Sequence, residues 1–541
     1  MQAPLSRFRF RAVQAILAVA VLFQFVPALA AGNETSRRAP VGGVAGVYGD
    51  SEIAVEAAFA RARSEAKPVL LYWGAAWCPP CNQLKATLFN RRDFIALSHA
   101  VIPVYLDGDL PGAQKQGSRF KVVGYPTLIL FSSDQTEITR LPGEADANRV
   151  VAALKAGLIG RRPVSEVLVA ALSGTPLGAT EWLALAFYAW ETDEAKLVNR
   201  EERAGVLMDL ARRSQAVSPE ASTRLWLKAL VARDAGSKPA TRGDRTAQEQ
   251  TERLLKVLGD LDATRLNADV IMEGARPILK ALTEASDAAR APLLVGYTAA
   301  LVRLQNDGQL SRADRTGALI ARVDLARLDV ADDAVSVALP PSLLVEVKAL
   351  AKRMDAEITN GFERQAVITS VAHLLGEAGL WSESDALLKA NLKRSHAPYY
   401  LMSQLGRNAR KTGRKTEALA WYESAYRTSK GPATRLQWGA NYIAALVDLA
   451  PQESERIEKA VLDLFADAAK DKGAFYERSG RSLRRVTAKI SSWNESGAHA
   501  AEVARLRARH HDLCQGIGAA DPQRKLCEGL WSDSTSDIAA L

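Results

Sequence analysis

The chain of 541 residues is too long to fold around one hydrophobic core, so two or more domains are expected. Its composition, 48% hydrophobic and 24% charged, is ordinary for a soluble globular protein. The net charge of +9 comes from cations interspersed with acids along helical stretches, which argues against a nucleic-acid partner.

The N-terminus has the order of a secretory signal peptide. Three arginines within the first eleven residues precede an apolar run over residues 12–26, and Pro27-Ala-Leu-Ala30 supplies a small-residue cleavage pattern. We therefore expect residues 1–30 to be removed after Ala30 and the mature protein to be exported, soluble and periplasmic. In the alternative interpretation residues 12–31 stay as a membrane anchor, because they are long enough to span a bilayer.

Residues 31–49 are rich in glycine and predict a flexible leader, and the pattern then changes to an α/β domain over residues 50–158. A helix is expected over residues 50–66, with an apolar face of Ile53, Ala57, Ala58 and Ala60. Short apolar runs predict strands at residues 68–74, 101–107 and 127–133, the last turning into a hairpin partner at 137–141 before a helix at 144–157. This alternation indicates a mixed sheet.

Two motifs in this domain carry its specificity. Trp77-Cys-Pro-Pro-Cys81 directly follows an expected strand, and Gly124-Tyr-Pro-Thr127 directly precedes another. Together with Gly143 after the hairpin, these residues resemble the thioredoxin fold, and especially its exported thioredoxin-like branch. The resemblance covers residues 51–157, about a fifth of the chain.

The Cys-Pro-Pro-Cys spacing suits a redox-active disulfide. A cysteine at the start of a helix places its sulfur among unpaired N–H groups, which stabilises a thiolate and makes Cys78 the expected nucleophile. Cys81 lies about one helical turn further on and would resolve a mixed disulfide. Pro79 and Pro80 remove two N–H donors, so we expect moderate acidification of Cys78, which favours a reductant or isomerase over a strong oxidant.

The resemblance also implies a cis peptide bond before Pro126, whose backbone would contact substrate, and a shielding and docking role for Trp77. The alternatives are a trans proline that begins a strand and a tryptophan that only packs beside the strand end. Many thioredoxins carry a buried aspartate six residues before the first cysteine, where this chain has Tyr72. The proton acceptor for Cys81 is therefore unassigned, and neither Asp107 nor Asp109 takes the role on sequence grounds.

The rest of the chain predicts helices only, divided into an α-helical region at residues 160–350 and a tetratricopeptide-like domain at 351–541. The second assignment rests on small and large residues at helix-pair spacing: Leu405, Gly406, Ala409, Gly413, Ala418, Tyr422 and Ala425. Gly379, Ser384, Leu388 and Asn391 lie 34 residues before Gly413, Ala418, Tyr422 and Ala425. Such pairs bury their apolar faces by stacking and usually bind partner proteins. The alternative is an irregular helical domain with one accidental repeat.

Cys514 and Cys527 are the other two cysteines, and after export we expect them to form a structural disulfide. A metal site of His510, Cys514 and Cys527 and a redox relay from Cys78 are the alternatives.

The sequence thus predicts an exported thiol–disulfide oxidoreductase that acts on protein disulfides, with the helical part selecting or holding a protein partner. No cofactor and no metal are expected, and a reductive role requires a membrane-linked electron donor. The alternative is an interaction scaffold in which the thioredoxin-like domain docks partners with little turnover.

Overall fold

The structure is a computed structural model that describes Val44 and residues 47–48, 52–143, 146–192, 196–233, 245–331 and 334–532. The expected signal peptide, its cleavage site and the alternative anchor at 12–31 lie outside these residues. Within the described residues, no helix combines the length and the apolar character needed to cross a membrane.

Five strands form one mixed sheet in the order β1-β3-β2-β4-β5. These strands are β1 (Val47–Tyr48), β2 (Val69–Gly74), β3 (Ile102–Asp107), β4 (Thr127–Phe131) and β5 (Glu137–Pro142). Strand β3 runs parallel to β1 and β2, whereas β4 runs antiparallel to both β2 and β5. The expected strands and hairpin are therefore present. The segment expected to be a flexible leader differs in one respect, because its residues 47–48 gain backbone hydrogen bonds by pairing with β3.

The helices of this α/β domain are α1 (Glu52–Glu65), α2 (Pro79–Ala86), α3 (Arg92–Ser98), α4 (Pro111–Phe120) and α5 (Ala147–Gly160), with a 3₁₀ turn η1 at Leu88–Asn90. The expected apolar face of α1 is wrong at three of its four positions, because Ala58 is buried but Ile53, Ala57 and Ala60 are exposed. Ile53 is 80% exposed, and the helix instead buries Val55, Ala58, Phe59 and Ala62. The larger side chains Val55 and Phe59, one turn apart, determine which face meets the sheet.

Alternate residues of β2 face two different cores, as the period of a strand requires. Leu70 and Tyr72 pack with Leu84 and Phe94 on one side of the sheet. Val69, Leu71 and Trp73 pack with α1 on the other side. Both faces of β2 are therefore buried, which fixes the strand end from which the Cys-Pro-Pro-Cys segment leaves the sheet.

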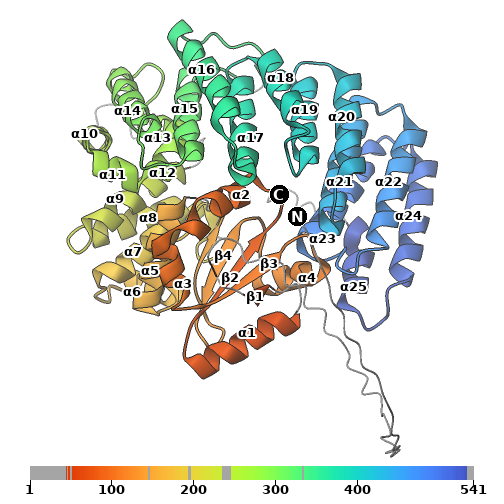
Figure 1. Cartoon of the computed structure of the whole chain (residues 1–541), viewed down its shortest axis with the longest axis horizontal. Coiled ribbons are helices and arrows are strands. Elements are labelled where there is room, and N and C mark those ends of the chain that lie inside the picture. The colour runs from red at the N-terminus through yellow and green to blue at the C-terminus, as the bar shows by residue number, and fades with distance from the viewer. Residues whose placement is uncertain are drawn as a thin grey trace, which may run out of the picture. The chain divides into compact units, whose positions relative to one another are not determined.

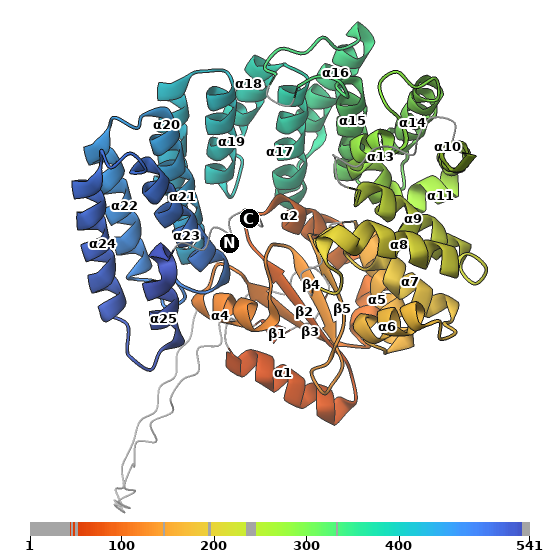
Figure 2. The ribbon, with the colours of Figure 1, turned by 180° about the vertical axis from the view of Figure 1, so that it is seen from behind.

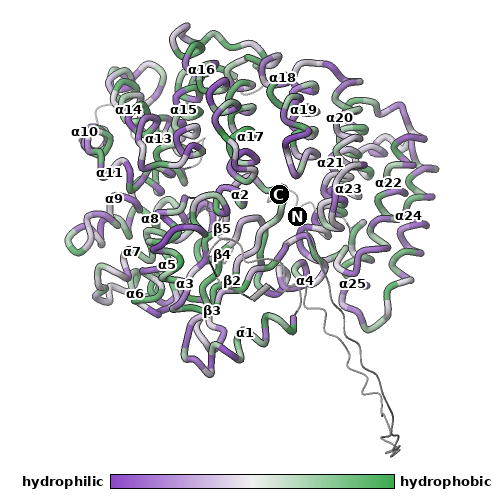
Figure 3. Tube along the Cα trace, in the orientation of Figure 1, coloured by the Kyte–Doolittle hydropathy of each residue, from purple (hydrophilic) through white to green (hydrophobic). Residues whose placement is uncertain are grey.

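After β5 the described residues contain helices and no strand. The first group comprises α6 (Val164–Ser173), α7 (Ala179–Phe187), α8 (Arg200–Ser214), α9 (Pro219–Val231), α10 (Arg245–Gly259), α11 (Leu261–Leu266), α12 (Ala268–Glu273), α13 (Ala275–Leu282), α14 (Arg290–Gln305), α15 (Arg312–Ala326) and α16 (Pro341–Glu357). The second comprises α17 (Gly361–Glu377), α18 (Trp381–Asn391), α19 (Pro398–Lys411), α20 (Lys415–Thr428), α21 (Pro432–Leu449), α22 (Ser454–Ala468), α23 (Glu477–Trp493), α24 (Ala500–Gln515) and α25 (Pro522–Glu528). Hydrophobic and hydrophilic residues alternate along most of these helices, as Figure 3 shows, whereas α9 and α17 bury most of their residues.

Two successive helix pairs, α17–α18 and α19–α20, turn in the same way. Gly379 and Gly413, the two glycines 34 residues apart, occupy the turns with φ of 75° and 76°, a conformation that favours glycine. In α19, a Cβ on Gly406 would approach the ring of Tyr422 to 3.1 Å, so glycine lets α20 pack closely. The two helix pairs thus share one turn geometry, and the tetratricopeptide-like assignment stays a prediction.

The helical region contacts the α/β domain at several separate places, and the described residues of both form one compact unit. Helix α7 packs against α5, α17 packs against α2, and both α21 and α23 pack against α4 (Figures 1 and 2). Helices α17, α21 and α23, from different parts of the chain, therefore lie around the end of the sheet domain where α2 begins.

Candidate functional site

Cys78 and Cys81 are joined by a disulfide at the start of α2, with their Cα atoms 5.2 Å apart. Cys78 is the N-cap residue of α2, and the backbone N–H of Cys81 donates a hydrogen bond of 3.2 Å to Sγ of Cys78. Pro79 and Pro80 occupy the first helical turn, where their missing N–H groups break no helical bond. The start of α2 thus offers the Cys78 sulfur one direct N–H donor and the positive end of a short helix.

The cis-proline loop lies directly beside this disulfide. The Tyr125–Pro126 peptide bond is cis, and the Tyr125 carbonyl oxygen lies 3.5 Å from Sγ of Cys78. The Tyr125 hydroxyl donates to the carbonyl of Gly108 at 3.0 Å and accepts from the Gln114 amide at 2.8 Å. These bonds fix the loop, so its backbone is held against the cysteine pair.

Trp77 packs against the helical region rather than facing solvent. Its ring stacks on Tyr400 of α19 and meets Trp438 of α21 edge-on, each with a centroid separation of 6.0 Å. The guanidinium of Arg478, on α23, lies 4.4 Å from the centre of the Trp77 ring and 5.4 Å from that of Tyr125. Three helices that follow the α/β domain by hundreds of residues therefore surround the residue next to Cys78.

The backbone before Cys78 is held from both regions. The Ala76 carbonyl accepts a hydrogen bond from Asn82 at 2.8 Å and lies 2.9 Å from Nε2 of His396. The Trp77 carbonyl accepts from the Gln365 amide of α17 at 3.4 Å. As a result Cys78 is only 1% exposed. The cysteine pair is buried beneath helices of the same chain.

The acidic residues near the pair have other partners. Asp109 accepts hydrogen bonds from the backbone N–H and the hydroxyl of Thr434 on α21, at 2.6 and 2.7 Å. Burial raises the pKa of the Asp109 carboxyl to about 6, while Arg478 acts in the opposite direction. Tyr72 is buried in the sheet core, and this burial raises the pKa of its hydroxyl far above its usual range. Tyr72 therefore cannot replace an ionised carboxylate, and Asp109 binds the helical region.

The second cysteine pair lies at the far end of the chain from the first. Cys514, on α24, and Cys527, on α25, form a disulfide with Cα atoms 5.6 Å apart, and both are buried. Nε2 of His510 lies 3.4 Å from Sγ of Cys514 and 3.6 Å from Sγ of Cys527. His510 thus adjoins both sulfurs as the metal alternative required, but the disulfide engages both thiolates that such a site would need.

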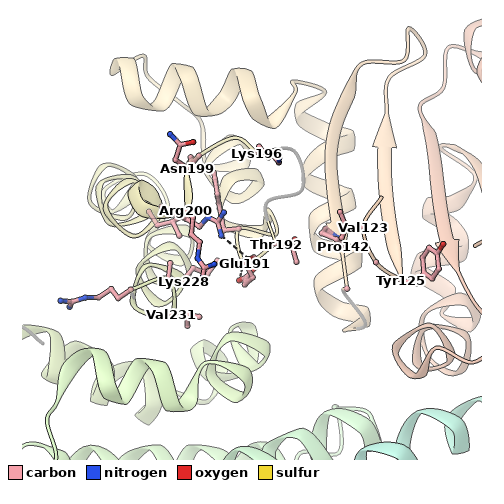
Figure 4. A pocket seen from close by; sticks show the side chains of 18 residues that line it. Val123, Tyr125, Pro142, Glu191, Thr192, Lys196, Asn199, Arg200, Lys228 and Val231 are labelled. Atoms are coloured by element: carbon pink, nitrogen blue, oxygen red, sulfur yellow. Dashed lines mark hydrogen bonds and ion pairs between the residues drawn. The ribbon is translucent and has the colours of Figure 1, made fainter. Parts of the chain in front are cut away.

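A pocket of about 940 Å³ opens on the outer flank of the cis-proline loop (Figure 4). Val123, Gly143 and Tyr125 line it from the α/β domain, and α8, α9 and the segment between α7 and α8 line it from the helical region. On the helical side, Lys228 pairs with Glu191 at 2.8 Å, and burial lowers the pKa of Lys228 to about 8. Val123 is 48% exposed, so this flank of the loop is open to solvent.

Comparison with known proteins identifies the class of the α/β domain. Residues 55–158 match a family described as a thioredoxin-like domain, and the fold and the Cys78–Cys81 disulfide agree with that assignment. This part of the chain is a thioredoxin-like domain, and a large all-helical region follows it.

A curated relative supports thiol–disulfide chemistry. The chain is 32% identical over 98 residues to the thiol:disulfide interchange protein DsbD of Pseudomonas fluorescens. The match covers 17% of this chain and 17% of that protein. The similarity therefore covers one domain of each protein and does not extend to the rest of either chain.

Sequence reasoning found the residues of the domain but missed those that cover them. Gln365, Tyr400, Trp438 and Arg478 carried no signal that linked them to this site. Each is an ordinary residue of an amphipathic helix, and only the tertiary contact with Trp77 distinguishes it.

Proposed function

We propose that the protein is an exported thiol–disulfide oxidoreductase that acts on protein disulfides through Cys78 and Cys81, as a reductase or an isomerase. The observation that carries the proposal is the cysteine pair at the start of α2, placed against the cis Tyr125–Pro126 loop. That pairing puts a nucleophilic sulfur beside backbone groups that a peptide can bind.

In the reductive direction, the reaction consists of two exchanges. The Cys78 thiolate attacks a substrate disulfide, whose S–S bond breaks as one substrate thiolate leaves and a mixed disulfide forms. The Cys81 thiolate then attacks Sγ of Cys78, which releases the second substrate thiolate and restores the Cys78–Cys81 disulfide. Two electrons pass to the substrate, so a dithiol donor must reduce the pair again. In an exported protein we propose a membrane-linked donor.

The helical region serves in this proposal to select or hold the partner protein. Its support is the arrangement of helix pairs α17–α18 and α19–α20, and the pocket between α8, α9 and the open flank of the cis-proline loop. The exposed residues Val123 and Gly143 border this pocket, so we propose that substrate reaches the loop from there.

Turnover of a protein disulfide such as that of insulin, with dithiothreitol as electron source, tests the proposal. Cys78→Ser should reduce turnover to background because the attacking sulfur is lost, and Cys81→Ser should accumulate mixed disulfides that mass spectrometry detects. The double variant Cys514→Ser/Cys527→Ser is the control and should keep turnover per folded molecule. Wild-type turnover that persists in Cys78→Ser contradicts the proposal.

The direction follows from the equilibrium potential of the Cys78–Cys81 pair against glutathione. A value near about −270 mV, as in thioredoxin, supports a reductant, whereas a value near about −120 mV indicates disulfide donation.

A second candidate, an interaction scaffold with little turnover, is favoured by one specific observation. Cys78 is buried, and the Trp77 side of the docking surface is already occupied by α19 and α21. A scaffold should capture the same partner proteins with wild-type chain and with Cys78→Ser. Loss of those partners in Cys78→Ser contradicts the scaffold and supports capture through the sulfur.

A further inference from the structure

Arg478 is a buried cation brought to the cysteine pair from the helical region. Its side chain is 9% exposed, and its guanidinium lies over the rings of Trp77 and Tyr125. One terminal nitrogen donates to the Gln437 side chain, and the other, Nη1, is buried without a hydrogen-bond partner among the described residues. A buried, incompletely bonded cation is costly unless a negative charge offsets it.

The two rings beneath this guanidinium belong to the residues that border the Cys78 sulfur. Trp77 precedes Cys78 in the chain, and the Tyr125 carbonyl oxygen is 3.5 Å from its Sγ. The position of α23 is fixed nearby, because the backbone N–H of Ser479 donates to Gln114 at 3.2 Å and Gln114 donates to the Tyr125 hydroxyl. The cation therefore lies in the same buried environment as the sulfur.

The other titratable groups around the pair include acids and bases, so some of their charges favour a thiolate at Cys78 and others oppose it. They are Asp107 at the end of β3, Asp109 just after it, Tyr125 before β4, His396 before α19, Tyr399 and Tyr400 on α19, and Arg481 and Arg485 on α23. The carboxyl of Asp109 interacts electrostatically with Arg478, and burial raises the pKa of Asp109 to about 6. Burial also lowers the pKa of His396, which favours its neutral form.

We propose that Arg478 is a positioning residue for the redox reaction, which stabilises the Cys78 thiolate of the reduced pair through its charge. The helical region thereby contributes to the chemistry of the thioredoxin-like domain as well as covering it. Since stabilising the thiolate favours the reduced pair, Arg478 makes the pair a weaker reductant than the local Cys-Pro-Pro-Cys sequence alone would make it.

The test is the pKa of Cys78 in the reduced full-length Cys81→Ser protein, followed by the ultraviolet absorbance of the thiolate against pH. A unit charge about 10 Å away at an effective dielectric constant of about 20 shifts a pKa by about one unit. Arg478→Gln should therefore raise the Cys78 pKa by about one unit. Arg478→Lys keeps the charge and should restore most of the wild-type value.

Two further variants make the outcome specific. Arg484→Gln removes the same charge from an exposed position of the same helix and should leave the pKa unchanged. Asp109→Asn removes the opposing charge and should lower the Cys78 pKa, so the sign of the effect is tested even if Arg478→Gln does not fold. An unchanged pKa in Arg478→Gln, an equal rise in Arg478→Lys, or no fall in Asp109→Asn overturns the proposal.

An equilibrium measurement with glutathione gives a second readout that packing alone would not move. With Cys81 present, Arg478→Gln should shift the equilibrium about tenfold toward the Cys78–Cys81 disulfide, the factor that one pKa unit represents. The inference rests on the proposed thiol–disulfide function, but titration needs no substrate. Failure of the pKa shift while the wild type turns over disulfides through Cys78 therefore refutes the role of Arg478 alone, whereas turnover that does not depend on Cys78 refutes the function.

Discussion

His510 shows how the surroundings of one side chain determine its charge. The imidazole is 4% exposed and lies against the disulfide of Cys514 and Cys527. Burial, together with the neighbouring His511, lowers the pKa of His510 to about 4. The neutral ring packs beside apolar sulfur, whereas a charged ring would lose its hydration there.

This pKa predicts an acid sensitivity. Since the folded pKa is below the unfolded value of about 6.5, the unfolded state binds the extra proton, so this stabilisation is complete above pH 6.5 and lost as pH falls toward 4. Between pH 7 and 5 the wild type should lose about 2 kcal/mol more stability than His510→Gln. Urea unfolding at both pH values measures the difference, with the exposed His99→Gln as control. Equal pH dependence in wild type and His510→Gln contradicts the prediction.

At the scale of elements, the contact between α23 and α4 depends on one glycine. Gly473 precedes α23, and a Cβ there would come within 2.8 Å of Cα and 2.9 Å of the carbonyl oxygen of Pro111 at the start of α4. These are backbone atoms, so they cannot turn aside as a flexible side chain would. Glycine thus allows α23 to approach the thioredoxin-like domain closely enough to place Arg478 over Trp77.

Gly473→Ala should therefore destabilise the protein by about 1–3 kcal/mol, the usual cost of overpacking. Urea unfolding gives the free energy, and Gly205→Ala is the matched control. Gly205 is exposed within α8 with open space around it, so alanine there should be neutral or stabilise by up to about 1 kcal/mol. If both variants are equally stable, the contact with Pro111 does not determine the position of α23.

At the scale of the whole described unit, early, middle and late helices of the helical region all contact the thioredoxin-like domain. Helix α7 packs on α5, α17 on α2, and α21 and α23 on α4. Because these contacts leave Cys78 1% exposed, a protein disulfide cannot reach its sulfur in this arrangement. Exchange with a partner requires local movement of the covering helices or of the loop.

This burial predicts a rate limit. The rate at which dithiothreitol reduces the Cys78–Cys81 disulfide should rise with its concentration and then level off, because opening becomes slower than the chemical step. Quenched alkylation followed by mass spectrometry measures the rate and separates this pair from Cys514 and Cys527. A rate that stays proportional to dithiothreitol over the whole range would show that the pair is accessible without opening.

Sequence by itself determined the thioredoxin-like domain and its local chemistry. The succession of strands and helices and the start of α2 at the cysteine pair depend on residues only a few positions apart, so local patterns reveal them. Most of the buried face of α1 was missed, because Ile53, Ala57 and Ala60 suggested a different stripe from the one that Phe59 enforces.

Only the tertiary structure decided what surrounds the cysteine pair. Tyr400, Trp438 and Arg478 follow Trp77 by more than three hundred residues, and an amphipathic helix can bury its stripe against many neighbours. Which helix meets which surface depends on the summed packing of the whole unit, to which close approaches such as Gly473 on Pro111 contribute. The sequence could therefore predict a redox-active disulfide, but not that it lies beneath its own helical region beside a buried arginine.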